Sequence, residues 1–95
     1  MAPEQQLTDY LHRLMDFDAA EDGAFNALFR EGMELLDLRT SDISEQFDVT
    51  GPSVRHWREG VSTPHPAIAR LILDSMRQRA ESQGARVLQH AAVAA

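Results

Sequence analysis

The chain has 95 residues, of which 43% are hydrophobic, so it can form one small domain with a modest core. It has no cysteine and no apolar run of about 18 residues, which excludes a disulfide framework, thiolate chemistry and a membrane-spanning helix. The formal net charge of −6 argues against a general nucleic-acid binder.

Charge is distributed unevenly along the chain. Residues 1–51 hold twelve acids and three arginines, a balance of −9, whereas residues 52–95 hold three acids and six arginines, a balance of +3. All nine basic residues are arginine, which can make planar, bidentate contacts with an anion. We therefore expect one face of the C-terminal half to meet an anion.

The hydrophobic pattern is helical throughout, because apolar residues recur at three- and four-residue spacing and no stretch alternates like a strand. We predict five helices, at about 4–17, 24–37, 41–47, 51–59 and from 66 onward. Gly84 is expected to end or kink the last one. The predicted organisation is an N-terminal helix with an acidic connector (1–20), a central domain (21–83) and a C-terminal helical tail (84–95).

Local signals place the ends of these helices. The candidate N-caps, whose side chains would accept a hydrogen bond from the first turn, are Asp22, Thr40 or Ser41, and Thr50. Pro52 suits the first turn of the fourth helix, where a missing N–H costs little, and Gly60 suits its end. Only a three-residue turn then separates the third helix from the fourth.

The fourth helix has two different sides when its residues are placed 100° apart. Val54 and Trp57 share one side and are expected to be buried against Ile43 and Phe47 of the third helix. The opposite side carries Pro52, Arg55, His56 and Glu59. The tip of the helix, with Thr50, Gly51 and Ser53, presents free N–H groups and the positive end of the helix dipole, which suit phosphate. An arginine-bearing helix face beside such a tip is what reading base edges in a major groove requires.

The segment DISEQFDVTGPSVRHWREG, residues 42–60, resembles the helix-turn-helix of phage repressor and Cro-type regulators, the XRE-like family. That family reads roughly L-A-x-x-hydrophobic-G-V-S-x-x-x-V/I-x-x-W-E-x-G, with a proline a few residues later. The matching positions are Ile43, Ser44, Phe47, Val49, Thr50, Val54, Trp57, Gly60 and Pro64. Asp48 stands in place of the turn glycine, and Arg58 and Glu59 invert the acidic position after the tryptophan. Because aspartate tolerates left-handed geometry, we expect the turn to be kept.

The resemblance implies an all-α, five-helix, lambda-repressor-like helix-turn-helix domain with an N-terminal helix and a long C-terminal helix. It implies a transcriptional regulator that reads double-stranded DNA with residues 50–59. The residues placed against base edges are Gly51, Pro52, Arg55 and His56. The candidates for phosphate contacts are Arg39, Thr40, Ser41, Thr50, Ser53, Arg58, Ser62, Thr63 and His65.

A single recognition helix buries too little surface to be selective, so we predict a homodimer on two half-sites. The weakly indicated dimer surface is Leu73, Ala80, Val87, Leu88 and Ala91, with the first helix around Tyr10 and Leu14 as the alternative. The core-facing side of the last helix is predicted to be Ile68, Leu71, Ile72, Ser75 and Met76.

Two other functions stay open on the same fold. The acidic N-terminal half, together with Glu59 on the exposed side of the fourth helix, favours a protein-interaction module such as an anti-repressor or adaptor. A DNA-binding antitoxin is the narrower alternative, with the alanine-rich C-terminal tail as the toxin-facing element. For Arg55, the alternative to DNA contact is a solvated pair with Glu59 at i,i+4.

No pattern indicates an enzyme, a cofactor or a metal site. The four histidines (12, 56, 65 and 90) lack metal-ligand spacing, and no glycine-rich phosphate loop is present. The acidic connector fails as a calcium loop, because positions three and twelve would be Ala20 and Phe29. The first ten residues lack the basic and apolar regions of a secretory signal, so we expect a cytoplasmic protein that is associated with the nucleoid when bound to DNA.

Overall fold

The computed structural model is all-helical, with five helices and no strand in the part of the chain that it describes. It describes the backbone of residues 3–18, 21 and 23–94, and the side chains of those between 5 and 84. The helices are α1 (Pro3–Met15), α2 (Ala24–Leu35), α3 (Thr40–Phe47), α4 (Gly51–Glu59) and α5 (Pro66–Ala94). None of the described helices is both long enough and apolar enough to cross a membrane.

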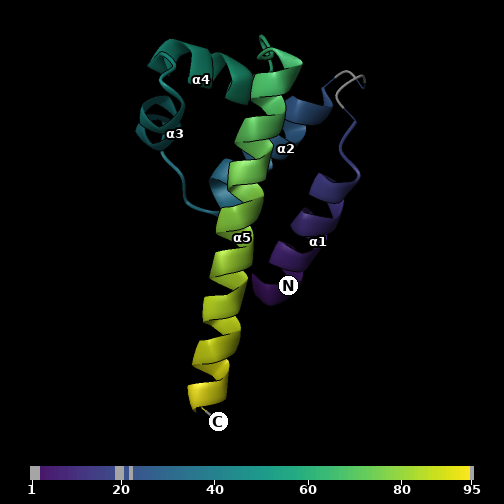
Figure 1. Ribbon diagram of the computed structural model, residues 1–95, viewed down its shortest axis with the longest axis vertical. Coiled ribbons are helices and arrows are strands. Elements are labelled where there is room, and N and C mark those ends of the chain that lie inside the picture. Colours follow the sequence, from purple (N-terminus) through teal and green to yellow (C-terminus); the bar gives the residue numbers. More distant parts are fainter. Residues whose placement is uncertain (1–2, 19–20, 22, 95) are drawn as a thin grey trace.

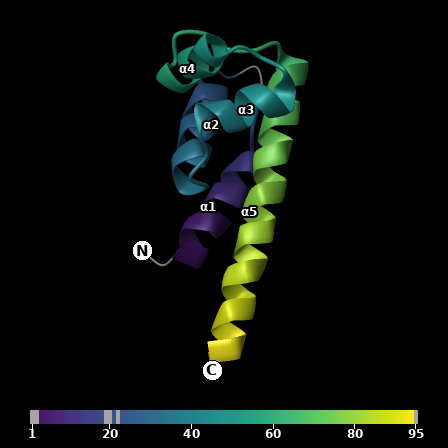
Figure 2. The ribbon, with the colours of Figure 1, turned by 90° about the vertical axis from the view of Figure 1, so that its left-hand side faces the viewer.

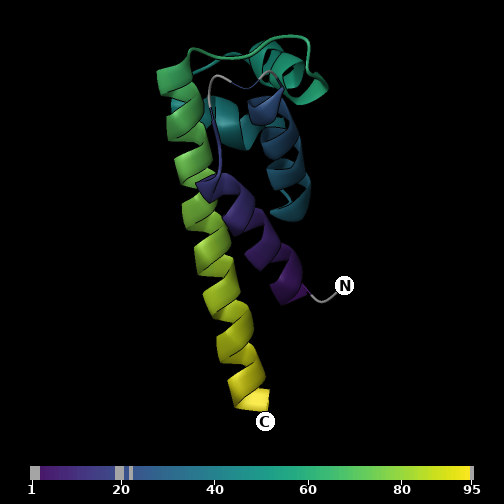
Figure 3. The ribbon, with the colours of Figure 1, turned by 90° about the vertical axis from the view of Figure 1, so that its right-hand side faces the viewer.

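The helix α5 forms the long axis of the molecule (Figure 1). The short helices α3 and α4 lie together near its N-terminal end, while α1 and α2 pack along its side. The C-terminal part of α5 extends past the other helices in all three views (Figures 1, 2 and 3). Gly84 does not end the last helix, because α5 runs without a break from Pro66 to Ala94. The expectation of a helix end at Gly84 was therefore wrong.

The turn between α3 and α4 follows the local signals of the sequence. Asp48 adopts the left-handed conformation (φ 52°, ψ 48°) and ends α3, a geometry that aspartate tolerates. Thr50 caps α4, and its hydroxyl accepts a hydrogen bond from the Ser53 N–H at 3.2 Å. Gly60 ends α4 with φ 80°, a conformation that glycine adopts without strain.

Two predicted caps differ from the structure. Neither Thr40 nor Ser41 precedes α3, because Thr40 is already its first residue and Arg39 holds the cap position. The first turn is instead closed by Asp42, whose carboxylate accepts a hydrogen bond from the Arg39 N–H at 2.7 Å. The cap position of α2 is occupied by Gly23 at φ 77°, without a side-chain hydrogen bond, and the predicted cap Asp22 lies outside the described residues.

The core is centred on the aromatic side chains of α2 and α4. Val54 and Trp57 are buried, as predicted, at 0% and 7% exposure. The indole of Trp57 packs edge-on against Phe25 and Phe29, with ring centroids 6.3 and 6.1 Å apart. The helix α4 is therefore anchored on α2 as well as on its neighbour α3.

The core-facing side of α5 is rotated from the predicted one. Ile68 and Leu71 are 36% and 57% exposed, so their assignment to the core was wrong. The buried residues of the helix are Ala69, Ile72, Leu73, Met76 and Ala80. The small side chains of Ala69 and Ala80 permit close approach of a neighbouring helix, which explains why this stripe, rather than the bulkier one, faces inward.

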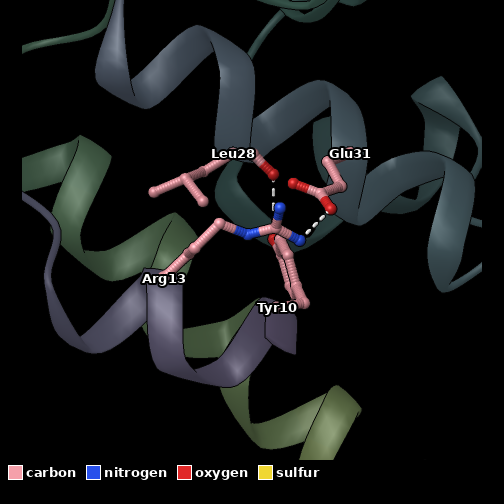
Figure 4. A network of polar contacts seen from close by, with 4 residues as sticks. All are labelled: Tyr10, Arg13, Leu28 and Glu31. Carbon is pink, nitrogen blue, oxygen red and sulfur yellow. Dashed lines mark hydrogen bonds and ion pairs between the residues drawn. The ribbon is translucent and has the colours of Figure 1, made fainter. Parts of the chain in front are cut away.

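The helix α1 docks through its single tyrosine (Figure 4). The Tyr10 hydroxyl donates to the Leu28 carbonyl of α2 at 2.9 Å and lies 3.4 Å from Met76 Sδ of α5. A Cβ on Gly32 would overlap that hydroxyl, so α2 needs glycine where the tyrosine enters. Arg13 and Glu31 form an ion pair on the solvent side of the same contact. Burial of the phenol, followed by the nearby Glu31 carboxylate, raises the pKa of Tyr10. The Arg13 guanidinium lowers this pKa by a smaller amount.

Candidate nucleic-acid interface

The outward side of α4 is exposed as the sequence predicts. Pro52, Arg55 and His56 are exposed to solvent, and Gly51 is half-buried at the start of the helix. Because Val54 and Trp57 are fixed in the core, the direction of this outward side is determined by packing. We call these four outward residues, Gly51, Pro52, Arg55 and His56, the reading face.

The C-terminal end of α4 is held by a residue that the sequence reasoning missed. The Asn26 side-chain amide donates to the Trp57 carbonyl at 2.8 Å and to the Ser62 carbonyl at 2.9 Å. The Val61 N–H also donates to the His56 carbonyl at 2.9 Å. These bonds satisfy carbonyls that the helix end leaves without partners and tie α4 to α2. The available signal was a polar amide next to Phe25 on the apolar stripe of α2.

An open depression of about 340 Å³ lies beside the reading face. It is lined by residues of α2, α3 and α4, namely Arg30, Glu34, Thr40, Arg55, Arg58 and Glu59. A Cβ on Gly51 would lie 3.9 Å from both Arg55 Nη1 and Thr40 Cγ2. The Arg55 guanidinium and the first residues of α3 and α4 therefore lie side by side. We call this feature the arginine depression.

Three arginines outside the depression have partners, whereas Arg70 of α5, like the arginines of the depression, forms no ion pair or side-chain hydrogen bond in the described part of the chain. Elsewhere, Arg13 and Arg77 form ion pairs with Glu31 and Asp74, and Arg79 donates to the Gln46 side chain at 2.8 Å. Within the described part of the chain, Arg30, Arg55 and Arg58 form no ion pair and no side-chain hydrogen bond. Arg55 is thus not paired with Glu59, although the two are one turn apart.

The structure gathers only some of the predicted phosphate residues at this place. Thr40 and Arg58 line the arginine depression. Thr50 and Ser53 lie at the start of α4 and are engaged with each other, their hydroxyl oxygens 2.8 Å apart. The remaining candidates are exposed, either at the start of α3 or in the segment between α4 and α5: Arg39, Ser41, Ser62, Thr63 and His65. His65 also has a local role, because its Nδ1 accepts the Ala67 N–H at 3.1 Å at the start of α5.

The predicted dimer surface on α5 is not a continuous exposed stripe. Leu73 and Ala80 are 5% and 0% exposed and belong to the core of the chain, so they offer no surface to a second copy. Tyr10, the centre of the alternative surface, is likewise 0% exposed. Val87, Leu88 and Ala91 lie on the backbone of α5, but their side chains are outside the described residues.

Within the described residues, no three His, Cys, Asp or Glu side chains gather in a group that could hold a metal ion. The chemistry of the site is therefore that of an arginine-bearing helix face and an adjoining cationic depression. Comparisons of the chain with protein-family models, with curated proteins and with solved structures found no match.

Proposed function

We propose that the protein is a sequence-specific DNA-binding regulator that inserts α4 into the major groove. The observation that carries the proposal is the reading face, where Arg55 and His56 are exposed and Arg55 has no partner in the described part of the chain. The buried Val54 and Trp57 hold that face in a fixed direction. A rigid helix with outward donors is the arrangement that direct readout of base edges requires.

The dimensions and donors of α4 suit this role. An α-helix with its side chains is about 10–12 Å wide, and the major groove of B-DNA is about 12 Å wide. The guanidinium of Arg55 can donate two parallel hydrogen bonds to guanine O6 and N7. The half-buried Gly51 and the exposed Pro52 leave the tip of the helix slim, so that the backbone can approach the bases closely.

Glu59 is the one residue on the outward side that an anionic partner disfavours. It lies eight residues after Gly51, which is about 12 Å along the helix axis. If the N-terminal tip enters the groove, Glu59 stays near the groove's rim, where water and ions screen its charge. It also lines the arginine depression, beside Arg55 and Arg58, which offset its charge locally.

Selective binding requires two copies, because one nine-residue helix contacts too few base pairs. We propose a dimer that places two α4 helices on half-sites about one helical turn apart. The buried stripe of α5 offers no surface to a second copy, so we propose that the C-terminal part of α5, which projects past the other helices, joins the copies. We expect a DNA footprint that covers two half-sites about 34 Å apart, centre to centre.

Selection of bound sequences from a random DNA pool tests the proposed function. The expected outcome is a recurring motif in which a G·C pair occupies a fixed position, bound more tightly than random DNA in a mobility shift. Enrichment of no motif, with equal shifts on selected and random DNA, contradicts sequence-specific readout.

A second candidate function is the binding of a protein partner, as an anti-repressor, adaptor or antitoxin would do. It is favoured by a depression of about 500 Å³ between α1 and α2, lined by Gln6, Asp9, Arg13, Glu31, Glu34 and Leu35. Three carboxylates face one guanidinium there, which favours a basic partner. No shift of any DNA at low salt, together with a stable protein complex, supports this function over DNA binding.

A further inference from the structure

We propose that Arg30 and Arg58, with the Thr40 end of α3, bind one backbone phosphate of DNA beside the reading face. The inference deepens the proposed function, and it adds a contact from α2 that lies outside the two-helix unit. Arg30 lies 28 residues before Arg58 in the sequence, and only the fold brings the two together.

The first step is the convergence of three helices on one place. Arg30 comes from the middle of α2, Thr40 begins α3 and Arg58 is in the last turn of α4. All three line the arginine depression, and both arginines are exposed. A group bound there touches α2, α3 and α4 at once, and it fixes the orientation of α4 relative to whatever carries that group.

The second step is the charge of the depression. Its lining holds three guanidinium groups and the carboxylates of Glu34 and Glu59, a net charge of +1. None of these five groups forms an ion pair in the described part of the chain. A phosphate diester carries one negative charge, so a single backbone phosphate neutralises the depression. Guanidinium groups suit this anion because their planar fork matches two phosphate oxygens.

The third step is the position of the depression relative to the bases. Arg55 belongs both to the reading face and to the wall of the depression, next to Gly51 and Thr40. Thr40, the first residue of α3, lies at this same wall, so the positive end of that helix dipole adjoins the depression. When Arg55 is directed at a base, its charge stays at the wall of the depression, while Arg30 and Arg58 donate to the phosphate at the groove's edge. Such contacts fix the register of a protein on DNA without reading sequence.

The test is a double-mutant cycle on Arg30→Gln and Arg58→Gln, with affinities measured over a range of salt on a duplex selected from a random pool and on a shuffled duplex. Losing one phosphate contact lowers the slope of log affinity against log salt by about 0.9, by an equal amount on both duplexes. We expect the double variant to lose this amount, and the single losses to be coupled because both arginines hold the same phosphate. Arg30→Lys, which keeps the charge, is expected to retain the slope.

Arg77→Gln is the matched control, because it removes the same charge from an exposed arginine of α5 that lines a different depression. An unchanged slope in the Arg30→Gln and double variants, or an equal fall in Arg77→Gln, overturns the phosphate site while leaving base readout intact. A wild-type protein that shifts neither duplex overturns the proposed function and the phosphate site together. Thermal unfolding of each variant is measured as a control, and we expect these surface substitutions to leave the fold intact.

Discussion

Two sides of α2, one facing α1 and the other facing α4, differ in how their charged residues are paired. On the side facing α1, Arg13 and Glu31 pair with each other, and Tyr10 reaches a carbonyl and a sulfur in the core. On the side facing α4, Arg30 and Arg58 stand together without a partner in the described part of the chain. The first set of contacts is complete within the chain and serves the fold. The second is incomplete, and we interpret it as a surface that an anion completes.

The glycines show the same contrast. A Cβ on Gly32 would overlap the Tyr10 hydroxyl and lie 2.8 Å from Met76 Sδ, so this glycine is required by packing. A Cβ on Gly51 would meet nothing closer than 3.9 Å, which is ordinary contact. Gly51 is therefore not needed for the fold, and its small size keeps the tip of α4 accessible. We call the contact of α1 with α2 and α5, around Tyr10 and Gly32, the folding side of the molecule. The reading face and the arginine depression together form its binding side. Four substitutions test the difference between the two sides.

Gly32→Ala has the largest expected effect, and it falls on the folding side. The new methyl group must displace the Tyr10 ring from the core, which costs about 1–3 kcal/mol or more of the free energy of unfolding. Urea denaturation followed by circular dichroism measures the loss. Gly84→Ala is the matched control, because nothing lies within 4 Å of its Cβ position and alanine raises helix stability by up to about 1 kcal/mol. Equal effects of the two substitutions would show that Tyr10 does not pack as described.

Arg55→Ala falls on the binding side. It is expected to weaken binding to the selected duplex by about 1–3 kcal/mol and to relax the preference at one base pair. Its stability should change little, because the side chain is exposed and has no partner in the described structure. Arg13→Ala is the control from the folding side. Its exposed ion pair with Glu31 contributes at most about 1 kcal/mol to the free energy of unfolding, and we expect its loss to leave the affinity for DNA unchanged. An equal loss on selected and random DNA would refute the base-reading role of Arg55.

Tyr10→Phe tests the hydrogen bond that joins α1 to α2 on the folding side. It removes the hydrogen bond to the Leu28 carbonyl, which lowers the free energy of unfolding by about 1 kcal/mol. The pKa of Tyr10 is raised in the folded state, so the folded protein keeps the phenol proton at a pH where the unfolded chain loses it. The contribution of Tyr10 to stability is therefore constant below about pH 10 and falls above it, by at most about 1.4 kcal/mol per pH unit.

The alkaline range isolates this one group, because the chain has a single tyrosine, no cysteine and no lysine. Denaturation at several pH values between about 9 and 11 measures the fall in stability. The fall is expected in the wild type and absent in Tyr10→Phe. A wild-type stability that stays level across this range contradicts the burial of the phenol.

Asp48→Gly has the smallest expected effect, and it acts at the joint between the two sides. Glycine adopts the left-handed conformation of this position without strain, so the free energy of unfolding rises by about 0.5–1 kcal/mol. Asp48→Asn removes the same charge but keeps the side chain, which separates the backbone effect from the electrostatic one. A lower stability of Asp48→Gly than of Asp48→Asn would contradict the left-handed turn.

Short-range signals in the sequence were sufficient for the unit of α3 and α4. Thr50, Asp48 and Gly60 each determine their own backbone geometry, so the turn and the ends of α4 could be predicted without knowing the rest of the fold. The burial of Val54 and Trp57 followed from helical periodicity alone. The all-α class and the five helices were predictable for the same reason.

Contacts between distant segments were not predictable in this way. On α5, Ile72 and Met76 belong both to the predicted stripe and to the observed one, and only the packing of neighbouring helices selects between them. Asn26 stands out in the sequence only as a polar amide next to Phe25, and Arg30 carries no local signal, because the roles of both depend on where α4 lies against α2. The closure of α3 by Asp42 shows how a nearby carboxylate can replace an expected cap.

Direct readout by the reading face requires the protein to bind its selected duplex more tightly than a shuffled one. Fluorescence anisotropy with the selected duplex and a shuffled duplex of equal length, at one physiological salt concentration, tests it most directly. We predict that the wild type binds the selected duplex about 10³-fold or more tightly than the shuffled one, and that Arg55→Ala removes part of this ratio. Equal affinities of the wild type for the two duplexes would contradict it.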